Sequence, residues 1–539
     1  MLTTDRLFQI FLFCCLGSLF NNYLVAQTSS LWTDIDPSQI ATTRTAGNEI
    51  KLNAYRALEL DVEQFQQELL GAVNSTTTPI IELPLPDGQL KSFQVKVSPI
   101  LPAKLAAKYP EFQTFTIQSI ENPAITGRMD ISPRGAHFIL FGEKGTVFLE
   151  PLFEGQNRYY ANYYEKEDVS MKNMEGLTNA CGVVTKMEDD NTREITPTNN
   201  QDRPAKSRNS QETVNLRVYR LALTNTGEYA EYHRADTKGD VLFEFGTTVN
   251  FVNAIYERDF AIRFEIIEEI EELIFLDART DPFDVVNDVT LLIGKSATVI
   301  ELRVPRSQFD VGHTLTANCA TGGGAAGIAS LRSACQANRA TAASCQFSRN
   351  TGAFATNIFA HELGHQFAAT HSWSSCAGSG EEVTPYEPGS GSTVMSYAGL
   401  CGANNIQGNS DDYFHVANIE QVERHENRFD CASIVIVNNT VPVANILTAS
   451  GLTIPISTPF ELKGEGTDAD TEDRLTYCWE QFDIGPTSDL NNPSQNTPTF
   501  RSLPPTESPN RICPRLDNIL NNIRLWTKSR PKKIGKTIA

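Results

Sequence analysis

The feature that most constrains this chain is the segment FAHELGHQFAATHSW, which holds three of its eight histidines. His361 and His365 are four residues apart, so on a helix both imidazoles project from one face, a turn apart. That spacing suits two ligands of one zinc ion. Glu362 follows His361, so its carboxylate reaches a water beside the metal without being a ligand, and it can take that water's proton. The segment predicts a helix with a zinc site. A surface helix bearing two solvated histidines is the alternative.

The third histidine favours the metal site over the solvated helix. His371 lies six residues past His365, beyond the predicted helix, and a reversal of the chain would bring its imidazole back to the other two. Three nitrogen ligands leave one position open for water, which is the pattern of catalytic zinc. Structural zinc usually closes with four protein ligands, often thiolates, and no cysteine is interleaved here. The sequence therefore predicts a catalytic ion.

Two motifs together carry a resemblance to a known clan. HELGHQFAATH resembles the metzincin signature HExxHxxGxxH, and STVMSYAG, residues 392–399, is similar to the Met-turn that lies beneath the zinc in that clan. Within the clan the chain most resembles secreted reprolysin-type (adamalysin-like) metallopeptidases of bacteria, the bacteroidete kind in particular, in YEPGSGSTVMSYAGLCG and NSDDYFH. The resemblance covers roughly residues 80 to 525 and is most specific in 357–415.

The resemblance implies a role for each residue of these motifs. The three histidines would hold zinc, and Glu362 would act as general base and then pass the proton to the leaving amine. Met395 would be structural. Tyr397 matches a tyrosine that some metzincins bring near the zinc, where it helps to stabilise the transition state. A buried aromatic residue without that role is the alternative for Tyr397.

One position departs from the signature. Ala368 stands where the signature has glycine, at a left-handed turn that swings the third histidine back. A residue other than glycine in that conformation costs on the order of 1–2 kcal/mol. We expect the turn to form and zinc still to bind, with a smaller margin of stability at the site.

The N-terminus indicates the compartment. Arg6 precedes an apolar run from Leu7 to Phe20 and a polar break, and LVA ends at Ala26, so residues 1–26 are predicted to be a secretory signal peptide. The run is shorter than the roughly 20 residues of a membrane-spanning helix, and we expect no transmembrane segment. The net charge of -20 argues against nucleic acid or an anionic membrane surface as the main partner. We therefore expect a secreted monomer that acts on proteins or peptides.

Nine cysteines remain after the signal peptide, which is an odd number for a secreted protein. Six lie between Cys319 and Cys431, around the histidines, and predict three disulfides of unknown connectivity. Cys478 and Cys513 predict a fourth disulfide, and Cys181 is left alone. The segment NACGVVT around Cys181 resembles the cysteine switch of adamalysin-like propeptides, whose thiolate occupies the open zinc position. A buried free cysteine or an intermolecular disulfide is the alternative.

Composition and hydrophobic patterns predict the domains in the rest of the chain. Short alternating runs such as SFQVKVSPI and GAHFILFGEKGTVFLEP predict a β-rich region, whereas VNLRVYRLALT (strand), TTVNFVNAIYERDF (helix), IRFEIIEEIEELIFL (strand) and ATNIFAHELGHQFAATH (helix) predict an α/β domain. We expect a multidomain fold: a β-rich propeptide, an α/β metzincin-like catalytic domain and an incomplete C-terminal immunoglobulin-like (PKD-like) β-sandwich. The expected boundaries are 27–187 for the propeptide, 188–212 for a cleavable linker, 213–434 for the catalytic domain, 440–525 for the sandwich and 526–539 for a basic tail, truncated or genuine.

Two acidic segments are weaker candidates for Ca²⁺. Asp411 and Asp412 in NSDDYFH, and the acids of GTDADTED, fit solvated loops better than a calcium loop. The leading hypothesis is a secreted zinc metalloendopeptidase made as a latent zymogen. The alternative is a degenerate extracellular binding or adhesion protein that retains a zinc site. The intact Glu362 argues against it, because a binding protein gains nothing from a general base.

Overall fold

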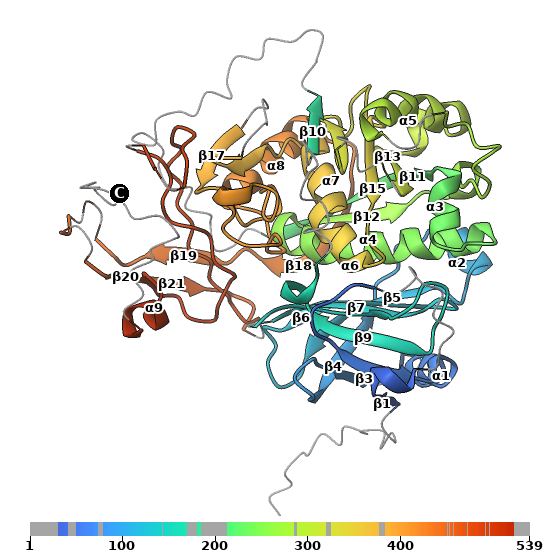
Figure 1. The fold of residues 1–539 in the computed structure, drawn as a ribbon, viewed down its shortest axis with the longest axis horizontal. Helices are drawn as coiled ribbons and strands as arrows, with labels where there is room; N and C mark the ends of the chain where they lie inside the picture. The colour runs from blue at the N-terminus through green and yellow to red at the C-terminus, as the bar shows by residue number, and fades with distance from the viewer. Residues whose placement is uncertain are drawn as a thin grey trace, which may run out of the picture.

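The computed structural model divides the described chain into an N-terminal β domain, a central α/β domain and a C-terminal region of short strands (Figure 1). It describes residues 31–40, 50–73, 79–142, 144–169, 181–184, 213–284, 288–317, 319, 325–376, 383–449, 451, 453–455, 458–471, 473–490, 492–494 and 496–521. The predicted signal peptide, the linker 188–212 and the basic tail lie outside these residues.

The N-terminal domain is one antiparallel sheet of nine strands, in the order β1-β2-β9-β8-β7-β6-β5-β4-β3. The indole Nε1 of Trp32 in β1 donates to the carbonyl of Glu82 in β3 at 3.2 Å, so the sheet curls until its first and last strands meet. One face forms a core of its own with helix α1, and the β-rich prediction for this region is confirmed. The bounds are β1 Trp32–Asp34, β2 Arg56–Leu60, α1 Val62–Val73, β3 Ile80–Pro84, β4 Leu90–Val97, α2 Ala103–Lys108, β5 Gln113–Ser119, β6 Thr126–Ser132, β7 Gly135–Gly142, β8 Gly145–Pro151 and β9 Tyr159–Tyr164.

The central domain is built on a sheet in the order β10-β14-β15-β13-β11-β12, with β18 added beside β11. Strands β12, β11, β13 and β15 are parallel, and β14 runs antiparallel to β15. The strand β10 comes from before the linker, yet it pairs parallel to β14 at the edge of this sheet. The bounds are β10 Cys181–Val184, β11 Thr213–Asn225, β12 Ile262–Ile266, β13 Val311–Ala317, β14 Gly327–Ser330, β15 Ala342–Gln346 and β18 Ser433–Thr440.

Helices pack on this sheet as an α/β domain predicts, with one correction. The strand expected over 262–276 ends at Ile266 and is followed by a 3-10 turn, Ile270–Leu273. Ile267, Ile270 and Leu273 are buried at intervals of three, which is the period of a 3-10 helix. The remaining elements of the domain are α3 Gly227–Tyr232, α4 Lys238–Phe260, α5 Val289–Arg303, α6 Thr351–Phe354, a π-helical turn Ala355–Phe359, α7 Ala360–Gln366, β16 His371–Trp373, β17 Val383–Glu387 and α8 Val416–Arg428.

The cysteines confirm one prediction and overturn another. Three disulfides join the six cysteines of the central domain, as Cys319–Cys345, Cys335–Cys431 and Cys376–Cys401. The predicted Cys478–Cys513 disulfide is wrong, because both thiols are free. The thiol of Cys478 contacts Ser502 and Leu503, whereas Cys513 lies opposite Phe460 in another strand pair.

The C-terminal region consists of two small antiparallel pairs, β19-β21 and β20-β22, joined by extended segments. The predicted immunoglobulin-like sandwich stays a prediction. Its elements are β19 Val443–Ile446, β20 Phe460–Leu462, β21 Gly464–Thr467, β22 Arg511–Cys513 and α9 Leu516–Leu520. Among the described residues, no helix has both the length and the apolar character to cross a bilayer.

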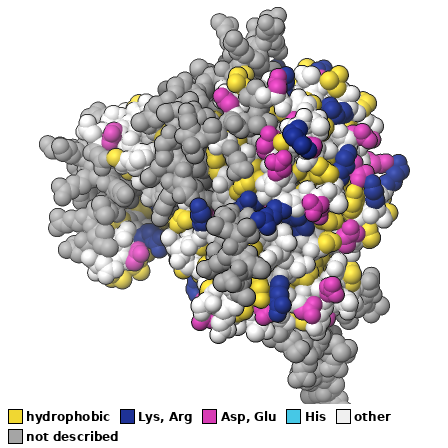
Figure 2. Space-filling view, turned by 45° about the vertical axis from the view of Figure 1, so that its right-hand side comes forward, with side chains coloured by type: hydrophobic (Ala, Val, Ile, Leu, Met, Phe, Trp, Pro, Cys, Tyr) yellow, Lys and Arg dark blue, Asp and Glu magenta, His cyan; other side chains and the backbone are white. Residues whose placement is uncertain are grey.

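All eight histidines lie in described residues and all are buried. None shows on the face in Figure 2, where acidic and basic side chains are interspersed with apolar and uncharged ones. The alternative of solvated surface histidines is therefore wrong for His361 and His365, which are 3% and 0% exposed.

Candidate metal centre

Helix α7 places the first two histidines and the glutamate. Every residue of α7 is buried, because the helix runs through the middle of the domain, and Tyr256 on α4 donates its hydroxyl to the Ala360 carbonyl at 2.8 Å. A π-helical turn precedes it, a rare form that often occurs at functional sites. The predicted helix is confirmed as far as Gln366.

The chain then reverses at Ala368, whose φ is 79°. The amide of Ala369 donates back to the Gly364 carbonyl at 2.9 Å, which closes the end of the helix. The expected left-handed turn is therefore present with alanine in it. The turn returns the chain so that β16 begins at His371, beside the two helical histidines.

Three ring nitrogens converge as a result. His371 Nε2 lies 3.1 Å from His365 Nε2 and 3.2 Å from His361 Nε2. His361 Nδ1 lies 2.8 Å from the Val394 carbonyl, and His365 Nδ1 lies 2.8 Å from the Ala369 carbonyl. A carbonyl only accepts, so these Nδ1 atoms carry the protons and both Nε2 atoms present lone pairs.

The electrostatics of the cluster keep the rings neutral. Burial lowers the pKa of His361 to about 4. Burial, and then the neighbouring imidazoles, hold the pKa values of His365 and His371 well below the usual range. Neutral imidazole is the form that binds metal.

The cluster fits a zinc ion. Nitrogens about 2.0–2.1 Å from a tetrahedral ion lie roughly 3.3 Å from one another, close to the spacing found here. Lone pairs facing each other at this distance repel unless a cation lies between them. His361, His365 and His371 are accordingly a group that could hold a metal ion.

Glu362 lies between this cluster and the edge of the sheet. It is 1% exposed, and its carboxylate lies against Gly327 of β14. Strand β10 is the next strand outward, with Cys181 in register with Gly327. The structure thus brings the backbone at Cys181 one strand away from the glutamate, and its side chain lies outside what is described.

Met395 and Tyr397 border the cluster from below and from one side. A Cβ on Gly364 would lie 2.7 Å from Met395 Sδ, so the methionine fills the space beneath α7. The ring of Tyr397 lies 4.6 Å from the His371 ring and 6.0 Å from the His361 ring, between centroids, and packs on Trp373. Both residues therefore lie beside the histidine cluster, and the roles that the resemblance implies for them stay predictions.

Sequence reasoning missed Glu387, which ties two of these elements together. Its carboxylate accepts from the hydroxyl of Ser372 at 2.6 Å, from that of Thr393 at 2.5 Å and from the amide of Ser392 at 2.9 Å. Glu387 is 1% exposed. It therefore joins the strand of the third histidine to the turn that holds Met395. A lone acid among small polar residues in YEPGSGST was the only signal in the sequence.

The acidic segments differ from expectation. Asp411 and Asp412 do not lie in a solvated loop, because Asp412 is 4% exposed and burial raises the pKa of Asp411 to about 6. Asp468, Asp470 and Asp473 come within reach of one another but are partly exposed. We find nothing that assigns Ca²⁺ to either segment.

Comparisons with known proteins found one family model and similar solved structures. Residues 215–425 match the model of the reprolysin-like metallopeptidase family M12B. Metalloproteinase-II from Bacteroides fragilis is a similar solved structure, at 9% identity and a TM-score of 0.39, over 68% of this chain and 96% of that one. No curated protein matches the sequence.

Proposed function

Residues 215–425 form a reprolysin-like metallopeptidase domain, and on this premise we propose that the chain is a zinc endopeptidase with Glu362 as its general base. The observation that carries the proposal is the convergence of three neutral, buried Nε2 atoms beside a buried carboxylate. His361, His365 and His371 would hold the ion. When bound, zinc lowers the pKa of a coordinated water and polarises a carbonyl.

The protein's own groups supply the rest of the chemistry. Glu362 takes a proton from the attacking water and gives it to the leaving amine. The carbonyls of Val394 and Ala369 fix the tautomers of two ligands, and Met395 supports the helix from below. Tyr397 would donate a hydrogen bond to the developing oxyanion, a role that its position beside His371 supports.

We propose further that residues 27–187 are a propeptide and Cys181 its switch. The pairing of β10 with β14 supports this, because β10 lies beside the strand whose Gly327 contacts Glu362. An added strand there excludes another extended chain from the same edge. Cys181 would supply the thiolate that closes the open ligand position.

Secretion and substrates follow as parts of the same proposal. Three disulfides are typical of an oxidising compartment, which supports the predicted signal peptide. A peptidase of this kind acts on proteins or peptides, and we propose that it works as a monomer. The degenerate binding protein is not favoured, because the glutamate is intact and the neighbouring strand leaves room for it.

The test measures zinc and activity together. The chain from Gln27 is analysed for zinc, and cleavage of a quenched peptide is followed after the N-terminal part has been removed by proteolysis. One zinc per chain is expected, with activity that Glu362→Ala abolishes while zinc stays bound. A chain that binds no zinc would overturn the proposal. Glu423→Ala on helix α8, which removes a carboxylate outside the proposed site, is the matched control and should keep full activity.

A further inference from the structure

We propose that the N-terminal domain stays docked on the peptidase domain after the chain is cut between β10 and β11, so that this cut alone leaves the peptidase latent. The latency of the peptidase rests on the proposed function, whereas docking depends only on the interface between the two domains. That interface contains aromatic rings that pack against glycines, which we call sockets, and buried ion pairs.

Three glycines of the peptidase domain form the sockets. A Cβ on Gly246 of α4 would lie 2.2 Å from the Phe112 ring, and a Cβ on Gly352 of α6 would lie 2.5 Å from the Phe148 ring. Gly239 of α4 meets the ring of Tyr109 in the same way, at 2.9 Å. Glycine inside a helix costs about 1 kcal/mol relative to alanine. Gly246 lies inside α4 (Lys238–Phe260), so the helix carries this cost where the Phe112 ring enters.

The rings also stack on aromatic side chains of α4. Phe112 stacks on Phe243 with centroids 5.8 Å apart, and Phe148 packs on Phe251 at 5.9 Å. Phe112, Phe148 and their partners are buried and belong to one apolar core that spans both domains. Such a core resembles the inside of a domain more than a transient contact.

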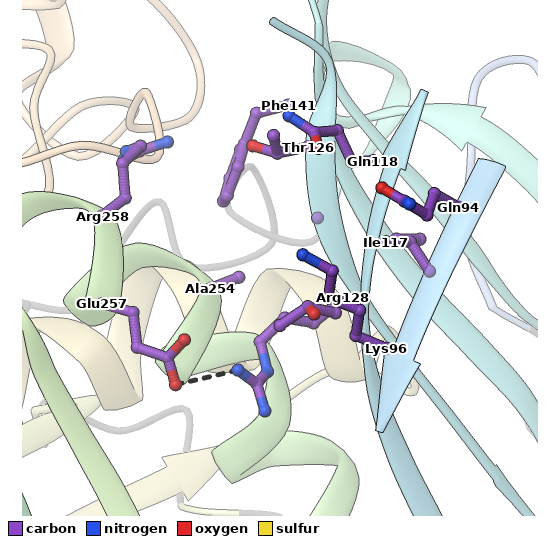
Figure 3. Close-up of a pocket in the computed structure, with 12 residues that line it drawn as sticks. Gln94, Lys96, Ile117, Gln118, Thr126, Arg128, Phe141, Ala254, Glu257 and Arg258 are labelled. Atoms are coloured by element: carbon purple, nitrogen blue, oxygen red, sulfur yellow. Dashed lines mark hydrogen bonds and ion pairs between the residues drawn. The ribbon is translucent and has the colours of Figure 1, made fainter. Parts of the chain in front are cut away.

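Buried ion pairs surround the apolar part. Arg134 of the N-terminal domain pairs with Glu244 of α4 and donates to the His233 carbonyl. Arg128 donates to Asn250 at 2.7 Å and to Glu257 at 2.8 Å, and Figure 3 shows it reaching from the sheet toward α4. It also lines an open hollow of about 340 Å³. Arg128 is 2% exposed. Separation would exchange these partners for water, so the pairs fix how the two domains fit together rather than supplying most of the affinity.

The position of β10 links docking to latency. A cut in residues 185–212 leaves β10 on the N-terminal fragment, attached to the docked domain through residues 170–180. Eleven residues span at most about 40 Å, so the docked domain holds β10 near its edge at an effective concentration in the millimolar range. The strand therefore returns to β14 faster than a substrate at ordinary concentration replaces it. Release of the whole fragment, or a second cut before β10, is needed for activity.

The experiment uses the full chain from Gln27 with a specific protease site placed between Val184 and Thr213. After cutting, the fragments are separated by size-exclusion chromatography without denaturant, and peptidase activity is assayed on the same sample. We expect the fragments to elute together with activity still at the uncut level. Gly246→Ala should weaken docking by about tenfold or more, because its Cβ meets the Phe112 ring. In that variant the fragments separate on dilution and activity appears.

Matched variants distinguish a steric block at Gly246 from a general loss of stability of the fold. Gly294→Ala in α5 makes the same change where nothing lies within 4 Å, and should behave as wild type. Phe112→Leu combined with Gly246→Ala frees the space and should restore docking. Separation of the wild-type fragments, activity in the cut complex that still elutes together, or equal effects of Gly246→Ala and Gly294→Ala would each overturn the proposal. If the fragments elute together and the released peptidase domain is inactive, docking holds and the proposed peptidase function fails.

Discussion

Gly327 and Glu362 are in such close contact that a Cβ on the glycine would lie 2.3 Å from the glutamate Oε1. The two residues belong to β14 and to α7, and no side chain fits between them. The absence of a side chain at Gly327 therefore lets β14 lie directly against the general base that we propose.

Gly327→Ala should lower kcat/KM by about tenfold or more, because the methyl group pushes the carboxylate from its place and a misplaced base transfers protons poorly. The zinc content should stay at one per chain, since the atoms nearest to a Cβ at this position belong to Glu362 and not to a histidine. Steady-state kinetics and metal analysis on the released peptidase test this. Gly408→Ala, with nothing within 4 Å, should leave both unchanged, and equal loss in the two variants would refute the contact's role.

Ala368→Gly should stabilise the protein slightly. Alanine at φ 79° is strained by about 1–2 kcal/mol, and glycine relieves this strain. Glycine also gives the unfolded chain more conformational entropy, and this destabilising effect is somewhat smaller than the strain that is relieved. The expected rise in the free energy of unfolding is a few tenths of a kcal/mol to about 1 kcal/mol, and zinc should bind more tightly. Ala369→Gly next to it, at a residue without positive φ, should instead destabilise. Denaturant titration of both variants decides, and a loss of stability in Ala368→Gly would contradict the strain.

Glu387→Gln should weaken zinc binding by about tenfold while the fold is retained. The glutamine side chain has the same shape but only one acceptor oxygen, whereas the donors now use both oxygens of the Glu387 carboxylate. The strand of His371 therefore loses hydrogen bonds that hold it to the Met395 turn. Competition with a chelator measures the affinity, and circular dichroism follows the fold. Glu420→Gln on the exposed face of α8 is the control. If zinc affinity is unchanged, Glu387 serves packing only.

His233 should make docking of the N-terminal domain depend on pH. Its Nδ1 lies 3.1 Å from Glu154 and 3.4 Å from Glu244, which only accept, and its Nε2 faces the Gln346 oxygen at 2.9 Å. The amide of Gln346 is oriented by donating to the Ser348 carbonyl. Both ring nitrogens therefore donate, and the ring is an imidazolium.

Burial opposes this charge, but the carboxylates of Glu154 and Glu244 outweigh it and raise the pKa of His233 above its ordinary value. Because the pKa of His233 is raised in the docked state, the protonated ring stabilises docking. This contribution to the free energy of docking is complete below about pH 6.5 and is lost as the pH rises through the raised value. The dissociation constant of the cut fragments should therefore increase from pH 6 to pH 9. His233→Gln should reduce that dependence, and an unchanged slope would contradict the assignment.

Much of the site could be predicted from local sequence, for a physical reason. The helical period places His361 and His365 on one face, and the resemblance to the signature implied the left-handed turn at Ala368. The alternating runs likewise predicted strands β4, β7 and β8. Each of these depends on neighbours within about one turn or one hairpin, where the chain's own stereochemistry decides.

The tertiary structure decided what joins residues far apart in sequence. The pairing of six cysteines, the free thiols of Cys478 and Cys513, and the burial of Asp412 follow from which elements pack together. So do the contact of Gly327 with Glu362, the bonds of Glu387 and the sockets for Phe112 and Phe148. The sequence by itself determined which chemical groups the peptidase site would use. Packing determined what they touch, because burial and close contact depend on the whole fold rather than on local period.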